Sequence, residues 1–157
     1  MNYREWLLEV PSEITGDPLW KMEVYRLALF AADVAWIDVT RLVRDRRTIS
    51  LSDQLYRSAG AVSADISEGY SRQSGKDQAR FYEYALGSAR EARNWYFVAR
   101  HVLAEAVNQH RLCLWTQIIR HLLRIIPSER GYHMKEDATH YSAFPRDLLE
   151  SIPLPAD

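Results

Sequence analysis

The sequence contains a single cysteine and has no apolar run that approaches the ~20 residues of a membrane-spanning helix. One cysteine, Cys113, excludes an internal disulfide framework, and its apolar surroundings favour a buried thiol. The N-terminal residues carry acidic groups inside their apolar stretch, so we expect no signal peptide. These absences favour a soluble protein of the reducing cytoplasm, with no membrane partner.

The common motifs of catalysis and cofactor binding are also absent. The sequence has no G-x-x-x-x-G-K-[ST], G-x-G-x-x-G or G-x-S-x-G, which leaves phosphate loops and the nucleophile elbow without support. It has no Glu-x-x-His, the motif that supplies ligands in ferritin-like di-metal bundles. His101 and Glu105 provide only two ligands, and His110 and His121 are isolated. We therefore expect no metal, no cofactor and no enzyme activity, and a metal-dependent helical hydrolase is the remote alternative.

Apolar residues are plentiful, at 47% of the total, which is enough for one domain with a sizeable core. The charge is unevenly spread, because residues 1–40 and 125–157 have net charges of −4 and −3, whereas residues 41–124 have +6. A basic middle favours an anionic partner. A solvated surface, onto which the acidic ends fold back, is the plainer alternative.

Four stretches have the apolar periodicity of helices, and no stretch alternates like a strand. The first begins at Asp17-Pro18, because Asp is a good N-cap and Pro fits the first helical position, and it runs to about residue 44. The others cover about 50–69, 74–103 and 107–126, with S-x-x-D caps at Ser50 and Ser74 and a stop at Pro127. These patterns predict an all-α protein, an antiparallel up-down-up-down four-helix bundle.

The bundle domain then covers residues 17–126, between two less regular ends. Residues 1–16 form an N-terminal extension with one short helical turn around Trp6. Residues 127–157 form a partly irregular C-terminal tail, in which a short helix at 146–151 is the one candidate element.

The first helix has two apolar stripes, although a helix at the surface of a monomer needs only one. We assign the second stripe to contacts between subunits and expect an obligate homo-oligomer. The predicted interface residues are Tyr25, Leu29, Trp36 and Val39.

Small residues are concentrated in the second and third helices, where Gly60 and Gly87 predict a close approach of the two axes. A set of polar residues shares one side of these helices. We interpret it as a buried network that joins the two helices, so that removing Arg57 or Glu68 would cost about 3–5 kcal/mol, and a catalytic acid cluster is the weaker alternative. The network residues are Gln54, Arg57, Asp65, Glu68 and Glu91.

Basic side chains gather at two helix ends and make two separate patches, since these ends lie at opposite poles of an up-down bundle. Either patch is a candidate nucleic-acid contact, and solubilising or helix-capping charge is the alternative. The residues are Arg41, Arg44, Arg46 and Arg47 in the first patch, and Arg72, Lys76 and Arg80 in the second.

The order and spacing of residues 54–91 carry a family resemblance. The matching residues are Gln54, Arg57, Ser58, Ala59, the run Asp65-Ile66-Ser67-Glu68-Gly69, Arg72, Ser74, Phe81, Ala85, Gly87-Ser88 and Glu91. Over residues 18–126 the chain resembles the "four helix bundle protein" family. That bacterial family includes proteins encoded in intervening sequences of 23S ribosomal RNA genes, once labelled ribosomal protein S23, and the accessory variability protein of diversity-generating retroelements. Asp65 and Ser67 stand where the family pattern has Asn and Ala.

The resemblance implies an antiparallel four-helix protomer and a ring-like homopentamer. For some members it implies association with nucleic acid or with a reverse transcriptase. We therefore expect a non-enzymatic oligomeric scaffold that binds RNA, DNA or a nucleic-acid enzyme. A purely structural or protein-binding assembly without nucleic acid is the alternative.

Overall fold

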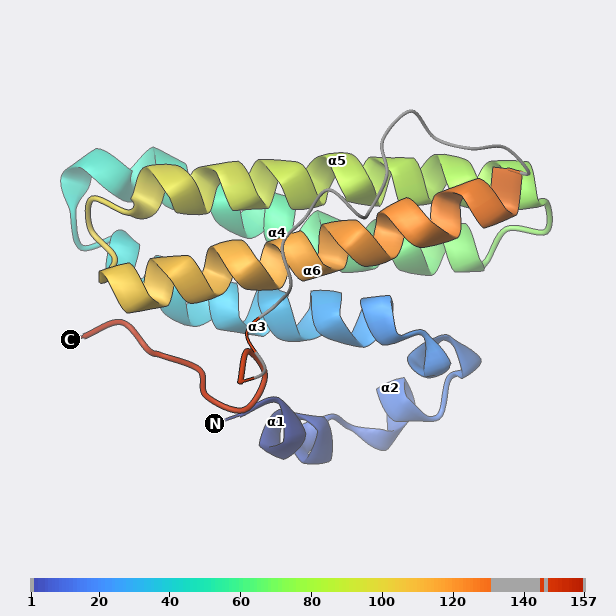
Figure 1. Ribbon diagram of the computed structural model, residues 1–157, viewed down its shortest axis with the longest axis horizontal. Coiled ribbons are helices and arrows are strands. Elements are labelled where there is room, and N and C mark those ends of the chain that lie inside the picture. The colour runs from blue at the N-terminus through green and yellow to red at the C-terminus, as the bar shows by residue number, and fades with distance from the viewer. Residues whose placement is uncertain (1, 131–144, 146, 157) are drawn as a thin grey trace.

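The computed structural model describes residues 2–130, 145 and 147–156, and within them it contains helices and no strand. Four long helices lie side by side along the long axis of the molecule (Figure 1). They are α3 (Glu23–Leu42), α4 (Ile49–Tyr70), α5 (Gly75–Ala99) and α6 (Glu105–Arg130). The short elements are α1 (Tyr3–Glu9), α2 (Ser12–Thr15), η1 (Pro18–Lys21) and η2 (Arg46–Thr48). The prediction of an all-α helical bundle is confirmed.

The core lies between the four long helices, and each contributes side chains that solvent does not reach. Every such aliphatic or aromatic side chain contributes about 1.5–3 kcal/mol when it is fully removed from water. The large side chains of this core include Leu27 and Phe30 from α3, Leu55 and Ile66 from α4, Tyr96 from α5, and Trp115 and Leu122 from α6.

Helix ends differ from the predicted ones where a local hydrogen bond competes with the helix. Asp17 does cap a helix by accepting from the backbone N–H of Leu19, but that helix is η1, and extended Met22 delays α3 to Glu23. The cap at Ser74 is confirmed, since its side chain accepts from the N–H of Asp77 at 3.1 Å. Pro127 does not stop α6, because it lies in the last turn and disturbs one backbone bond rather than a run of them.

The predicted cap at Ser50 does not form. Helix α4 begins one residue earlier, directly after η2, and its N-cap residue Thr48 makes no side-chain capping bond. The Thr48 hydroxyl instead donates to the carbonyl oxygen of Asp45 at 3.0 Å, and Ser52 donates to the carbonyl oxygen of Thr48 at 2.7 Å. The hydroxyls of this corner therefore satisfy carbonyls of the connection rather than the N–H groups of α4.

The close approach of α4 and α5 occurs at Gly69 and not at the predicted Gly60 and Gly87. A Cβ atom at Gly69 would lie 2.8 Å from Cε1 of Tyr82, so only glycine fits there without a shift. Gly60 and Gly87 face open space on the surface of the pair. Gly60 and Gly87 are therefore not required by packing between α4 and α5.

The N-terminal segment of the same chain packs against α3. The α1 helix has a capping box between Asn2 and Glu5, and it buries Trp6 against Phe30 at a ring-centroid distance of 5.3 Å. The indole Nε1 of Trp6 donates to Asp33 Oδ2 at 2.6 Å. Neither Phe30 nor Asp33 belongs to the predicted interface, so this contact within the chain does not occupy the interface residues.

Only one of the four predicted interface residues is open to solvent. Val39 is buried, and Tyr25 and Leu29 are half-buried against the core of the same chain. Trp36 is 60% exposed and packs edge-to-face on Tyr56 of α4, at a ring-centroid distance of 5.5 Å. Trp36 is therefore the residue of this set on which the prediction of subunit contacts now rests.

The last described segment, residues 147–156, runs beside α1 and the face of α3 and α6 (Figure 1). We call it the C-terminal strap. The predicted short helix at 146–151 is instead a turn, in which the N–H groups of Glu150 and Ser151 bond the carbonyl oxygen of Asp147, and Arg146 lies outside the described residues. Leu148 is the buried side chain of the strap.

A candidate nucleic-acid interface

Two arginines lie over one aromatic ring at the end where α4 leads into α5. The guanidinium carbons of Arg72 and Arg80 are 4.5 Å and 5.5 Å from the ring centroid of Phe81. Phe81 meets Tyr84 edge-to-face at 5.6 Å, and Tyr84 is 52% exposed. Lys76 is exposed one turn before Arg80. We call these five residues the basic–aromatic surface.

Close backbone packing holds this surface in place. Gly69 allows Phe81 and Tyr82 of α5 to approach the end of α4, since their side-chain atoms lie within 3.0 Å of a Cβ built there. A Cβ at Gly75 would lie 2.7 Å from the carbonyl oxygen of Glu129, so the start of α5 packs equally closely on the end of α6. The surface therefore lies on a corner where three helices meet.

The chemistry of this surface suits a planar anionic ligand. A guanidinium above an aromatic face is held by cation–π attraction while its N–H edges stay available to acceptors. Arg72 uses one of its donors on Glu68, in an ion pair whose side chains are 43% and 51% exposed. Exposed rings beside cations can stack bases while the cations contact phosphates.

The other predicted basic patch lies at the opposite end of the long helices, around the α3–α4 connection (Figure 1). Two of its arginines are engaged: Arg41 Nε donates to the carbonyl oxygen of Ala156 at 3.0 Å, and Arg47 forms an ion pair with Asp45. The hydrogen bonds from Arg47 lower the pKa of Asp45 to about 2. Arg44 and Arg46 are exposed, and the patch has no ring–cation stack like that at Phe81.

The prediction of a buried ion-pair network between α4 and α5 is wrong, because three of its five members are exposed and pair within their own helices. Arg57 lies 3.8 Å from Asp53, with side-chain exposures of 73% and 65%. Glu68 pairs with Arg72, and Glu91 accepts from Trp95 Nε1 at 3.2 Å. Their helical spacing is real, but it places them on the solvent side of the close-packed seam.

Two members of that predicted set are half-buried, Gln54 and Asp65. Asp65 does reach α5, through a hydrogen bond with Ser88. Burial and the nearby charge of Glu68 nonetheless raise the pKa of Asp65 above its usual value. The link between the helices at this level is one hydrogen bond and not an ion-pair network.

The polar cluster that is buried lies elsewhere, on α3, α5 and α6. Arg111 donates from Nε to Asp38 Oδ2 at 2.7 Å and from Nη2 to Asp38 Oδ1 at 3.0 Å, and neither side chain is exposed. The hydroxyl of buried Tyr96 donates to the same carboxylate at 2.8 Å. Burial and the charge of Asp38 raise the pKa of Tyr96 well above its usual value. Sequence reasoning missed this cluster, although Asp38 and Arg111 each lie within the apolar stripe of a helix.

His110 extends the cluster toward the strap. A guanidinium can only donate, so the 2.9 Å contact from Arg111 Nη1 makes Nδ1 of His110 the acceptor. The Nε2–H group then donates to the carbonyl oxygen of Leu148 at 2.7 Å. Burial, reinforced by the charge of Arg111, lowers the pKa of His110. This histidine is therefore a neutral link and not an isolated ligand.

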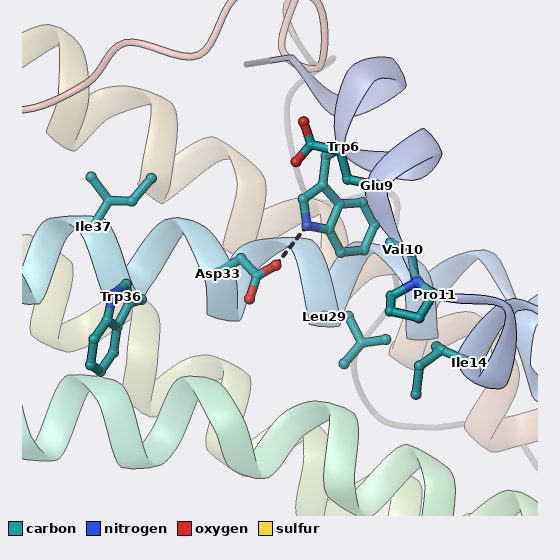
Figure 2. Close-up of a pocket in the computed structure, with 9 residues that line it drawn as sticks. All are labelled: Trp6, Glu9, Val10, Pro11, Ile14, Leu29, Asp33, Trp36 and Ile37. Atoms are coloured by element: carbon teal, nitrogen blue, oxygen red, sulfur yellow. Dashed lines mark hydrogen bonds between the residues drawn. The ribbon is translucent and has the colours of Figure 1, made fainter.

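A groove separates the N-terminal segment from α3 (Figure 2). It has a volume of about 410 Å³ and is mostly apolar, with exposed Trp36 at one end. Its charged lining residues are Glu9 and Asp33, and Asp33 already accepts from Trp6. Two carboxylates would repel a phosphate, so the groove does not compete with the basic–aromatic surface as a site for nucleic acid.

Within the described part of the chain, neither a metal site nor a membrane-spanning helix is found. No group of three His, Cys, Asp or Glu residues there is arranged to hold a metal ion. None of the helices described has the length and hydropathy needed to cross a membrane. Cys113 is half-buried rather than fully buried, and burial raises the pKa of its thiol.

Comparison with known protein families gives a match over the central part of the chain. A family model described as 23S rRNA-intervening sequence protein matches residues 21–126. The chain belongs to this family. The matched range begins just before α3 and ends within α6, so it includes the basic–aromatic surface and both partners of the buried ion pair. No curated protein and no solved structure matches the chain. The relation to the accessory variability protein stays a prediction.

Proposed function

We propose that this protein is a non-enzymatic helical scaffold that binds single-stranded nucleic acid through the basic–aromatic surface. The observation that carries the proposal is the stack of Arg72 and Arg80 over Phe81, beside exposed Tyr84. Single strands suit this arrangement because an unpaired base can lie on the exposed ring of Tyr84 while the cations contact the backbone. A duplex would offer the phosphates alone.

Membership of a family named for 23S rRNA-intervening sequences supports an RNA ligand. The other partner that we propose is a nucleic-acid enzyme such as a reverse transcriptase. The description of the family does not itself assign either one. A purely structural assembly, or one that binds only proteins, is the competing function. These alternatives predict no salt-sensitive retention of an oligonucleotide.

The test measures binding of a fluorescent single-stranded RNA by anisotropy between 25 and 300 mM salt. Each phosphate contact should contribute about −0.7 to the slope of the logarithm of the binding constant against the logarithm of the salt concentration. We expect K76E/R80E to weaken binding at least about tenfold and to flatten the slope, since two phosphate contacts become repulsive. The matched control is R44E/R46E, which makes the same change in net charge at exposed positions of the opposite end. Equal losses in both variants would mean that net charge alone drives binding.

We further propose that up-down-up-down protomers assemble into a homopentamer. Trp36 packs edge-to-face on Tyr56 and is 60% exposed, so its large indole leaves apolar area in water. This exposed apolar area supports a contact surface on α3 and α4. Light scattering should give about five times the 18.3 kDa protomer mass for the wild-type protein. Trp36→Glu should lower that mass, whereas a monomeric wild-type protein would contradict the assembly.

A further inference from the structure

Four hydrogen bonds join the C-terminal strap to the helices beneath it, and carbonyl groups of the strap accept all four. His110 Nε2 donates to Leu148 O at 2.7 Å, and the backbone N–H of Tyr3 donates to Leu149 O at 3.1 Å. Arg111 Nη2 donates to Pro153 O at 2.9 Å, and Arg41 Nε donates to Ala156 O at 3.0 Å. In all four bonds the groove beneath the strap is the donor.

A groove that offers donors selects a particular kind of chain. An extended segment of ordinary residues would bring N–H groups that need acceptors of their own. Proline has no N–H, and Pro153 and Pro155 occupy alternate positions at the end of the strap. The groove is therefore complementary to a proline-containing segment that follows a turn with an aliphatic anchor like Leu148, which is 6% exposed.

The strap does not fill the space it lies in. A cleft of about 370 Å³ lies between α6 and the strap, lined by residues such as Gln109, Cys113 and Ser151. A second cleft, of about 270 Å³, borders Pro155 and Ala156, and a third, of about 450 Å³, borders Leu148 and Leu149. All three clefts are open to solvent, so the strap lies at the surface of the protein and not within its core.

We propose that the groove beneath the strap is a peptide-binding site, and that the strap is its built-in competitor. The partner is a segment of another protein with a turn at an aliphatic residue and, five positions on, a proline carbonyl, as in Leu148 and Pro153. Such a segment accepts from His110 and Arg111 as the strap does. If the strap left and no acceptor replaced it, the donors of His110 and Arg111 would lose hydrogen bonds, which is costly. Replacement of the strap by another segment that supplies carbonyl groups is therefore favoured over simple opening. The site is separate from the basic–aromatic surface.

The experiment uses a fluorescent decapeptide with the sequence of residues 147–156, added to full-length protein. L148D removes the anchor of the strap, and L154D is the matched control, because Leu154 is 51% exposed. We expect L148D to bind the peptide at least about tenfold more tightly than wild type or L154D, since occupancy by the strap reduces the apparent affinity. The same peptide with Asp in place of its first leucine should bind none of the three proteins. Equal binding of both peptides, or no binding to a folded L148D, overturns the proposal.

A measurement on the wild-type protein covers the case in which L148D does not fold. Amide hydrogen exchange of Glu150 and Ser151, which bond Asp147 O within the strap, should be at least about 100-fold faster than that of the long helices. The unlabelled decapeptide, added in excess, should further speed exchange of the strap of the protein. Strap amides that exchange only on global unfolding would show that the strap is not displaceable.

Discussion

Two groups of arginines in this molecule, one buried and one exposed, differ in the partners that the fold gives them. In the interior, the guanidinium of Arg111 donates to Asp38, His110 and Pro153, all of them acceptors within the same chain. At the α4–α5 end, Arg72 and Arg80 lie over the ring of Phe81, in contact with solvent. The comparison indicates that the role of an arginine here follows from the acceptors that the fold supplies, and not from its place in a basic stretch of sequence.

The largest effect should come from breaking the interior pair. Asp38→Ala leaves the buried guanidinium of Arg111 without its carboxylate, and we expect a loss of about 3–5 kcal/mol in the free energy of unfolding. The control is Asp53→Ala, which removes an exposed carboxylate and should change stability by less than about 0.5 kcal/mol. Urea titration followed by circular dichroism measures both. Similar losses in the two variants would mean that the interior pair contributes no more than a surface pair.

A smaller effect should appear as the pH falls, because His110 is neutral within the interior cluster. Its folded pKa is lower than its unfolded value of about 6.5, so the unfolded chain binds the proton more readily. The stabilisation is therefore complete above about pH 6.5 and is lost as the pH falls through the folded pKa. The groups that bear on this titration are Arg111, Asp38 and Asp147.

His121 also has a pKa lowered by burial, so wild type alone cannot isolate His110. His110→Gln keeps an amide that can donate to Leu148 but does not titrate. The difference in unfolding free energy between wild type and this variant should shrink as the pH is lowered from 7 to 5. A difference that is constant with pH would show that His110 does not titrate with folding.

The smallest effect should come from the surface charges along α4. Arg57→Ala and Glu68→Ala remove exposed pairs, and we expect each to lower the free energy of unfolding by at most about 1 kcal/mol. Thermal melts in low and high salt check this, because what remains of the effect should be screened by salt. A loss of several kcal/mol for Arg57→Ala would restore the buried network that the sequence suggests.

The existence of the four long helices could be predicted because each repeats apolar residues over many turns, and a long pattern tolerates local exceptions. The same reasoning misplaced the buried charges. The spacing of Arg57 and Glu68 predicts that they share one face of a helix. It does not predict whether that face is buried or exposed to solvent. Asp38 and Arg111 are 73 residues apart, so their pairing depends on how α3 and α6 pack. Their common signal is one charge within an apolar stripe of each helix.

The candidate site was predictable in part for a similar reason. Arg72, Lys76 and Arg80 are visible as a basic run around one connection. Phe81 and Tyr84 follow the apolar spacing of α5, but the structure leaves Phe81 half-buried and Tyr84 exposed. Nothing in the sequence separates this patch from the arginines of the α3–α4 connection. That distinction needs the partners that Arg41 and Arg47 find in the fold.

The most direct test of the account is to locate where a single strand touches the protein. Wild-type protein is irradiated with a single-stranded RNA that carries 4-thiouridine, and the attached residues are identified by mass spectrometry. We expect adducts at Tyr84 and Phe81 of the basic–aromatic surface, and at Tyr70, an exposed ring at the end of α4. Adducts confined to residues 36–57 at the opposite end, or RNA binding without any adduct at the α4–α5 end, would contradict it.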